Sequence, residues 1–360
     1  QGQLGNDSEA LFHHFMTIGV REGRSGNAEF NLRAYVLHNR DLLDYYKTDL
    51  SAYCKHYMEI GKAEGRTCLP TGDEQGLIGT YSTHYDTTVP RAVNIGIAVE
   101  RLNGTVIQPG QLFSYSQTLL PRIPENGYVM APAIGRYEYG GGICQVSTTL
   151  YNAVLLSELE VTERHNHSMI VTYVDPSADA AISESAGKDF RFVNNTDAPI
   201  YIEGYTTEDK MIGFTIYGHE TRDSGHKVVY ESEVVSKTYP DTEVIYPDGG
   251  LPVGTVSVQS AHIGYKANLW KVVYENGTET SREMVNSSTY KMAPRSATVG
   301  VATADPNAYN EIMAAIATGS IDHVKGVAAA LKAAAAPAEA AGEGAAAPAA
   351  EAPVAEVPAE

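Results

Sequence analysis

Three consecutive glycines, Gly140 to Gly142, stand directly before an amphipathic segment that begins near Cys144. Apolar residues recur at helical spacing over residues 146–157, which predicts a helix at 145–157 with one side facing a core. Glycine favours tight turns, so the triplet predicts a sharp turn into this helix. The surrounding chain must therefore cover one side of the helix and leave Cys144 at its N-terminus.

Cys144 is a candidate nucleophile because of this position. Unpaired backbone N–H groups and the positive end of the helix dipole favour an anion there, so the thiol ionises more easily. The thiolate is the reactive form of cysteine. The backbone amides of Gly140, Gly141 and Gly142 are candidate donors to an oxyanion. The alternative is a glycine-rich turn followed by a small, buried cysteine.

Two histidines follow in the segment ERHNHS, just before the strand-like SMIVTYV. In a strand, His165 and His167 would point to the same face, and a histidine beside such a cysteine is typical of thiol hydrolases. Either histidine is a candidate base, and Asp175 or Asp179 is a candidate orienting group. Zinc bound by these histidines and Cys144 is an alternative, but no fourth ligand is evident. We therefore predict no metal and no cofactor.

The first segment of the chain contains an internal repeat. HHFMTIGVREGR (13–24) and KHYMEIGKAEGR (55–66) are identical at seven of twelve positions. Apolar spacing in each copy predicts a helix that ends at glycine. We expect His14 and His56 to pack or to lie on helix surfaces, with metal binding as the alternative.

The other two cysteines lie close together in the sequence, at Cys54 and Cys68. We expect them to form a disulfide in an oxidising compartment, which leaves Cys144 as an unpaired thiol. Three reduced, buried thiols are the alternative.

Turn dipeptides and changes in periodicity divide the chain into five segments. The fold class that they predict is α+β, with a central mixed α/β domain. The tail lacks the apolar residues needed for a core, so we expect it to be disordered. The segments are a helical repeat region (1–76), the central domain (77–220), a small all-β module (228–301), a helical segment (302–332) and an Ala/Pro/Glu-rich tail (333–360).

Net charge and hydropathy exclude several classes of partner. The net charge of −18 disfavours nucleic acid, because no basic stripe is available to neutralise phosphates. No apolar run reaches the ~18 residues that a transmembrane helix needs, so we predict no membrane span. The chain begins at Gln1, not Met. We expect a mature, extracytoplasmic protein, secreted or associated with the cell wall, whose signal or anchor segment is absent from this chain.

Several blocks together resemble the VanW domain family over roughly residues 78–218. They occur in the order YSTHYD, RAVNIGIAVERLNGTVIQPGQLFSY, GGGICQVSTTLYNAVL, ERHNHS and DFRFVNNTDAPIYI. The resemblance implies a cysteine-dependent L,D-transpeptidase with Cys144 as nucleophile and His165 or His167 as base. It also implies an orienting or substrate-binding role for Arg91 and Asn94, although Pro90 stands where the family pattern has asparagine.

A later segment, LPVGTVSVQSAHIGYKANLWKVVYENGTETSREMVNSSTYKM, resembles the G-five domain. This small β-module is often linked to wall-binding proteins. Its glycine pattern is thinned here, since QSAHIG stands where a QSGxxG-like form is usual.

The function implied by the two resemblances is the formation of 3-3 cross-links in peptidoglycan. The partners would be peptidoglycan stem peptides, and the intermediate a thioester on Cys144. Two alternatives remain at this point. One is a non-catalytic wall-binding surface protein, and the other is a cysteine peptidase or amidase that cuts stem peptides.

Overall fold

The protein is described here from a computed structural model. The structure describes residues 14–15, 29–70, 76–85, 90–133 and 136–335. The first copy of the repeat, apart from residues 14–15, and nearly all of the tail lie outside the described residues. The described chain contains both helices and strands, and the strands form several small sheets. This confirms the α+β class. The chain divides into two compact units, the first with residues 1–167, 171–233 and 268–287, and the second with residues 168–170, 234–267 and 288–360.

Short helices at the start of the described chain enclose a small core of their own, around Tyr35 and Tyr53. Asn31 and Asp49 cap two of these helices by accepting backbone N–H bonds. His56, in the second copy of the repeat, shares a 2.7 Å hydrogen bond with the Tyr35 hydroxyl. The elements are α2 (Leu32–His38), a 3-10 turn (Arg40–Leu42), α3 (Leu43–Tyr46), α4 (Leu50–His56) and a π-helical turn (Tyr57–Gly61).

Cys54 and Cys68 are free thiols, so the predicted disulfide is not formed. Helix α4 turns Cys54 into the core around Tyr35 and Tyr53, where burial raises its pKa to about 12. Cys68 instead donates to the Glu29 carbonyl (3.3 Å) and to the Tyr57 hydroxyl (3.6 Å). Each sulfur is therefore held by other contacts.

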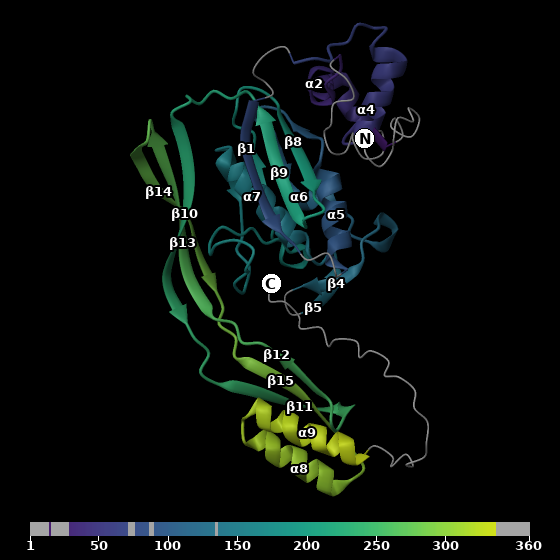
Figure 1. The fold of residues 1–360 in the computed structure, drawn as a ribbon, viewed down its shortest axis with the longest axis vertical. Helices are drawn as coiled ribbons and strands as arrows, with labels where there is room; N and C mark the ends of the chain where they lie inside the picture. Colours follow the sequence, from purple (N-terminus) through teal and green to yellow (C-terminus); the bar gives the residue numbers. More distant parts are fainter. Residues whose placement is uncertain (1–13, 16–28, 71–75, 86–89, 134–135, 336–360) are drawn as a thin grey trace. The chain divides into compact units, whose positions relative to one another are not determined.

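The central sheet consists of four antiparallel strands in the order β1-β9-β8-β2. Two helices, α5 and α7, contact each other and pack against this sheet, α7 on β1 and β9 and α5 on β8 (Figure 1). The core between them includes Ile95, Leu150, Val154, Ile202 and Phe214. The elements are β1 (Gly76–His84), α5 (Arg91–Leu102), β2 (Thr105–Ile107), α7 (Ile143–Leu156), β8 (Ile200–Thr206) and β9 (Met211–Gly218).

Smaller elements surround α7. A second sheet has the order β3-β7-β6, and β4 and β5 form a hairpin that leads into the glycine triplet. The strand predicted over residues 168–174 is absent, and this part of the chain consists of bends and irregular backbone. The elements are β3 (Leu112–Ser114), α6 (Tyr115–Leu119), β4 (Met130–Ala133), β5 (Arg136–Tyr139), β6 (Glu160–Glu163), β7 (Arg191–Val193) and 3-10 turns at Pro124–Asn126 and Glu184–Ala186.

Two further sheets follow, with the orders β10-β13-β14 and β11-β15-β12. In the second unit, α8 contacts β15 and α9 contacts β11 around a core that includes Val299, Ile312 and Val324. The elements are β10 (His226–Thr238), β11 (Glu243–Pro252), β12 (Val256–Gln259), β13 (Gly264–Glu275), β14 (Thr278–Tyr290), β15 (Arg295–Ala302), α8 (Pro306–Ala317) and α9 (Ile321–Ala335).

Parts of β10, β13 and β14 belong to the first unit. They contact α7 itself or Glu158, two residues beyond its end. Lys271 and His226 each lie 2.7 Å from a carboxylate oxygen of Glu158. Asn286 donates to the Tyr151 hydroxyl at 2.8 Å and to the Ser177 carbonyl at 3.0 Å. These strands therefore support the helix that carries Cys144.

Asn94, on α5, fastens the hairpin and the glycine triplet to the core. Its side-chain amide donates to the Val129 and Gly141 carbonyls at 3.0 and 2.9 Å, and its oxygen accepts from the Val129 N–H at 2.9 Å. The side chain is fully buried. Asn94 thus has a structural role, and the substrate contact expected of it is wrong.

Asn94→Ala should therefore destabilise the protein. It leaves the Val129 N–H and the Gly141 carbonyl without their asparagine partner, which we expect to cost about 3 kcal/mol of unfolding free energy. Urea unfolding measures this loss. The matched control is Asn195→Ala, which removes an exposed side chain that accepts one bond from Glu160 N–H. A loss below about 1 kcal/mol for Asn94→Ala would contradict the assignment.

The free thiols predict the result of an intact-mass measurement. Protein unfolded without reductant should take up three equivalents of iodoacetamide, because all three cysteines are reduced. In the folded protein Cys54 should remain unlabelled, because its raised pKa and its burial suppress the thiolate. Uptake of only one equivalent after unfolding would show that Cys54 and Cys68 form a disulfide after all.

Candidate active site

The glycine triplet meets two separate steric requirements. Gly140 and Gly142 have φ angles of +87° and +105°, which residues with a Cβ rarely adopt. Gly141 instead packs against β4, where a Cβ would lie 2.5 Å from the Ala131 carbonyl oxygen. The chain can therefore turn sharply from the hairpin into α7 only with glycines here.

Helix α7 begins at Ile143, two residues earlier than predicted, so Cys144 is its second residue. The thiol is partly buried and points to the Ile182 carbonyl at 3.6 Å. Cys144 therefore lies in the first helical turn, where the helix dipole favours a negative charge.

His167 and Asp179 form a buried hydrogen-bonded pair that acts on the Cys144 thiol. The backbone N–H and Nδ1 of His167 both contact Asp179 Oδ2, at 2.7 and 2.6 Å. A carboxylate only accepts, so Nδ1 carries the proton of this bond and Nε2 is left for the Cys144 thiol. The interaction of His167 with Cys144 lowers the pKa of the thiol and raises that of the imidazole. Asp179 thus fixes the orientation of the imidazole.

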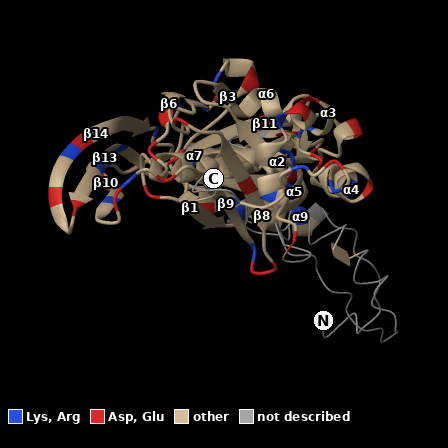
Figure 2. Ribbon diagram, turned by 90° about the horizontal axis from the view of Figure 1, so that it is seen from above, with Lys and Arg blue, Asp and Glu red and all other residues tan. Residues whose placement is uncertain are grey.

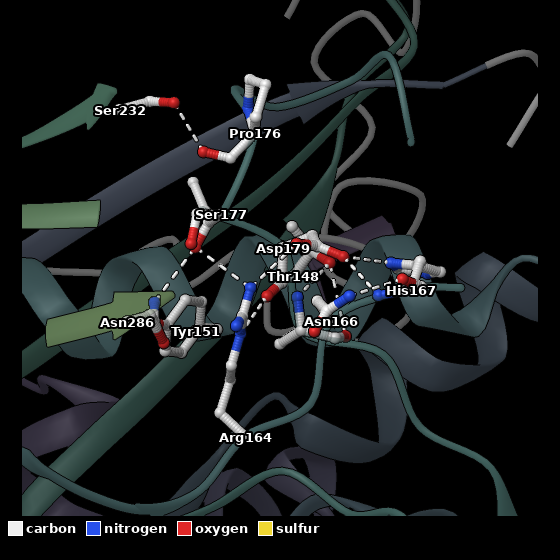
Figure 3. A network of polar contacts seen from close by, with 12 residues as sticks. Thr148, Tyr151, Arg164, Asn166, His167, Pro176, Ser177, Asp179, Ser232 and Asn286 are labelled. Carbon is white, nitrogen blue, oxygen red and sulfur yellow. Dashed lines mark hydrogen bonds and ion pairs between the residues drawn. The ribbon is translucent and has the colours of Figure 1, made fainter. Parts of the chain in front are cut away.

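Arg164 holds the opposite side of Asp179, as Figure 3 shows. Its guanidinium donates to Asp179 Oδ1 at 2.9 Å, to the Asp179 carbonyl at 2.6 Å and to the Ser177 carbonyl at 3.0 Å. Asp179 is fully buried, and Arg164 is 7% exposed. The carboxylate therefore lies between two cationic groups, and it cannot rotate away from His167 without breaking these bonds.

The contacts set the protonation states. Burial alone would raise the pKa of the Cys144 thiol, but the hydrogen bond and charge of His167 outweigh it and lower the pKa. For His167 burial opposes the charge, yet the bonds to Asp179 and then Cys144 raise its pKa to about 9. Asp179 would also be raised by burial, but His167 and Arg164 lower its pKa. These contacts therefore favour a thiolate beside an imidazolium over the neutral pair.

The polar side of α7 binds the segment that contains Asp179. Ser147 donates to the Ala180 carbonyl at 2.5 Å, and Thr148 accepts from the Ala180 N–H at 3.0 Å. Asn152 donates to the Ala178 carbonyl at 2.8 Å. We call this set of bonds the α7 seam. The seam fixes the position of Asp179 along the axis of α7, the helix that carries Cys144.

The structure separates the two candidate histidines and the two candidate aspartates. His165 pairs with Glu163 at 3.1 Å and is 38% exposed, so it is not part of the pair that acts on Cys144. Asp175 is exposed, whereas Asp179 is buried beside His167. The expectation that both histidines lie in one strand is wrong, because β6 ends at Glu163. Hydrogen bonds between residues 164–167 and the Asp179 segment take the place of strand pairing there.

The oxyanion donors differ from those expected. The Gly140 N–H is committed to the Val129 carbonyl at 3.4 Å, and the Gly141 N–H to the Glu138 carbonyl at 3.3 Å. No carbonyl in the described part of the chain accepts from the N–H of Gly142 or Cys144. These two amides, at the start of α7, are the candidate donors. Arg91 lies beside them, since a Cβ on Gly142 would be 3.3 Å from Arg91 Nε.

Sequence reasoning did not identify Arg164 or the α7 seam. Thr148 and Asn152 lie four residues apart on the predicted helix, so they share one face of it. This polar spacing is the one sequence pattern that indicates the α7 seam. Arg164 lies in the segment ERHNHS, but its partner Asp179 is fifteen residues away and only the folded chain brings them together.

The described residues also limit other kinds of site. No group of three or more His, Cys, Asp or Glu side chains among them lies close enough together to hold a metal ion. None of the described helices has the length and hydropathy that crossing a bilayer requires. Lys and Arg residues are interspersed with Asp and Glu, as strand β14 illustrates in Figure 2.

Comparison with known proteins gives two family matches. Residues 90–217 match the model of the VanW-like proteins, and residues 230–304 match the G5 domain. An uncharacterised protein of Bacillus subtilis, YoaR, is 36% identical over 152 residues, which are 41% of this chain and 50% of that protein. The vancomycin B-type resistance protein VanW of Enterococcus faecalis is 29% identical over 133 residues, 34% of this chain and 48% of that protein.

The chain spans about half the length of these curated relatives. A solved structure of the G5 domain of an IgA1 protease aligns with 28% identity and a TM-score of 0.15, and covers 23% of this chain and all of that domain. Both resemblances that the sequence suggested are confirmed by the family matches. The chain therefore contains a VanW-like domain over residues 90–217 and a G5 domain over residues 230–304.

Proposed function

We propose that this protein is a cysteine acyltransferase that forms 3-3 cross-links between peptidoglycan stem peptides. The observation that carries the proposal is the buried, hydrogen-bonded pair of His167 and Asp179, whose imidazole lowers the pKa of the Cys144 thiol at the start of α7. A thiolate beside an imidazolium that a carboxylate orients is the arrangement of a cysteine nucleophile. The VanW-like and G5 matches support an extracytoplasmic, cell-wall-associated setting for this chemistry.

Acylation is the first step of the proposed reaction. The Cys144 thiolate attacks the carbonyl carbon of the third residue of a donor stem, and the N–H groups of Cys144 and Gly142 stabilise the oxyanion. The imidazolium of His167 gives its Nε2 proton to the departing amine of D-alanine. The carbon–nitrogen bond breaks, a thioester remains on Cys144, and His167 becomes neutral.

Transfer is the second step. The side-chain amine of a second stem attacks the thioester carbon, and neutral His167 accepts the proton from that nitrogen. The carbon–sulfur bond breaks, which restores the thiolate and the imidazolium and leaves an amide between two stems. Attack by water in place of the amine would make the protein a peptidase, so the acceptor decides between joining and cutting.

Cys144→Ala should abolish the formation of new muropeptide dimers while the protein stays folded. The nucleophilic sulfur is lost, but the change removes little volume and should cost only about 1 kcal/mol of stability. Mass spectrometry of muropeptides incubated with purified protein measures the dimers, and Cys68→Ala is the matched control. A folded Cys144→Ala protein that still makes dimers at the wild-type rate would overturn the nucleophile. Shortened stems without dimers would indicate a peptidase, and unchanged muropeptides with the unaltered protein a wall-binding role.

The rate at which iodoacetamide alkylates Cys144 should depend on His167 and on pH. We expect the ion pair to have formed by pH 7 in the unaltered protein, so the rate should be nearly constant between pH 7 and 9. In His167→Gln the buried thiol keeps its proton, so the rate at pH 7 should fall about 100-fold and rise with pH. His165→Gln is the control and should match the unaltered protein.

Dimer formation should instead decline above about pH 9, where His167 loses the proton that the leaving amine requires. It should also decline at low pH, where the thiolate is protonated. An alkylation rate in the unaltered protein that rises with pH as for an ordinary thiol would show that no ion pair exists.

A further inference from the structure

Arg122 lies beside the turn that carries Cys144, on a segment to which no role has been assigned. A Cβ on Gly140 would be 3.0 Å from Arg122 Cδ and 3.7 Å from its Nε, so the side chain lies against this glycine. Its Nη2 donates to Glu184 at 2.9 Å. Glu184 follows Ile182, whose carbonyl contacts the Cys144 thiol, by two residues. Arg122 therefore links the glycine turn to the segment that contains Ile182.

The guanidinium of Arg122 has an unused donor. Its side chain is 11% exposed, and Nη1 is buried. Nη1 nevertheless has no hydrogen-bond partner among the described residues. Buried guanidinium nitrogens without an acceptor are uncommon, and they call for an ion, a water molecule or a ligand. Glu184 is 61% exposed, so the existing ion pair is weak and open to exchange with another carboxylate.

The surroundings of Arg122 favour an anion. Arg91, the first residue of α5, lies against Gly142, which belongs to the same turn as Gly140. The first turn of α7 adds the positive end of its dipole. Glu138, on the hairpin strand β5, acts in the opposite sense, since its charge raises the pKa of the Cys144 thiol. A planar guanidinium binds carboxylate through two parallel hydrogen bonds, which makes carboxylate the anion that fits a peptide substrate.

We propose that Arg122 binds the terminal carboxylate of the donor peptide, one residue beyond the bond that Cys144 attacks. This inference deepens the proposed function and rests on it for the identity of the substrate. The carboxylate of the leaving D-alanine is three bonds from the scissile carbonyl carbon, about 4 Å away, so a group beside Gly140 is within reach. The site would therefore select stems that end at the fourth residue over longer stems.

Two alkylating reagents test the carboxylate site without any transfer reaction. Iodoacetate and iodoacetamide both place a carbon on the Cys144 sulfur and release iodide, but only iodoacetate carries a carboxylate. Relative to free cysteine, the unaltered protein should favour iodoacetate by about tenfold or more, the effect of one charge-assisted hydrogen bond. Arg122→Gln should lose this preference by slowing iodoacetate alone, whereas Glu184→Gln should keep it.

Donor peptides test the same site during acylation. Intact mass would follow thioester formation on Cys144 with a tetrapeptide and with its C-terminal carboxamide. We expect the free acid to react about tenfold faster or more, and Arg122→Gln to remove the difference by slowing only the acid. Arg122→Lys, which keeps the charge but not the paired donors, should give an intermediate ratio.

The outcomes separate the two proposals. Equal rates for the acid and the amide in both tests, or an equal loss with both substrates in Arg122→Gln and Glu184→Gln, would overturn the carboxylate site and leave a structural ion pair. A preference for iodoacetate that Arg122→Gln removes, together with no thioester from any peptide, would support the carboxylate site and overturn the proposed acyl transfer.

Discussion

The α7 seam is the constraint on which the rest of the site depends. Helix α7 is held on one side by the apolar core against β1 and β9, and on the other by Ser147, Thr148 and Asn152. The hydrogen bonds of these three side chains replace a strand ladder, so the backbone of residues 178–180 has a single register along the helix. Cys144 and Asp179 come from chain positions 35 residues apart (179 − 144), yet their separation is fixed by one helix.

Charges alternate along the chain of side chains that starts at Cys144. The thiolate, the imidazolium of His167, the carboxylate of Asp179 and the guanidinium of Arg164 follow one another. Each buried charge has a neighbour of opposite sign, which offsets the large cost of removing ions from water. Removal of Arg164 would leave the Asp179 carboxylate buried with a single cationic neighbour. The pKa values of Cys144 and His167 therefore depend on a residue that contacts neither sulfur nor substrate.

Local features of the site were predictable from the sequence, and long-range ones were not. Apolar periodicity predicted α5 and α7, and the glycine triplet placed Cys144 at a helix start, because each depends on neighbours within a few residues. No local pattern separates His165 from His167, since both are polar residues after β6 and only the distant Asp179 distinguishes them. The strand expected at 168–174 is absent. The disulfide was wrong because tertiary contacts outweighed sequence spacing: Cys54 packs in a core, and Cys68 contacts Glu29 and Tyr57.

The contacts between α7 and strands β10, β13 and β14 bear on where this chain can be cut. A fragment limited to the matched residues 90–217 would omit β1, which pairs along its length with β9 and contacts α7. It would also omit Lys271 and His226, which hold the pKa of Glu158 below its usual range, and the donor that Asn286 supplies to Tyr151. The family boundary is thus a boundary of sequence similarity and not of autonomous folding, and an excised domain that follows it would expose an unpaired strand edge prone to association.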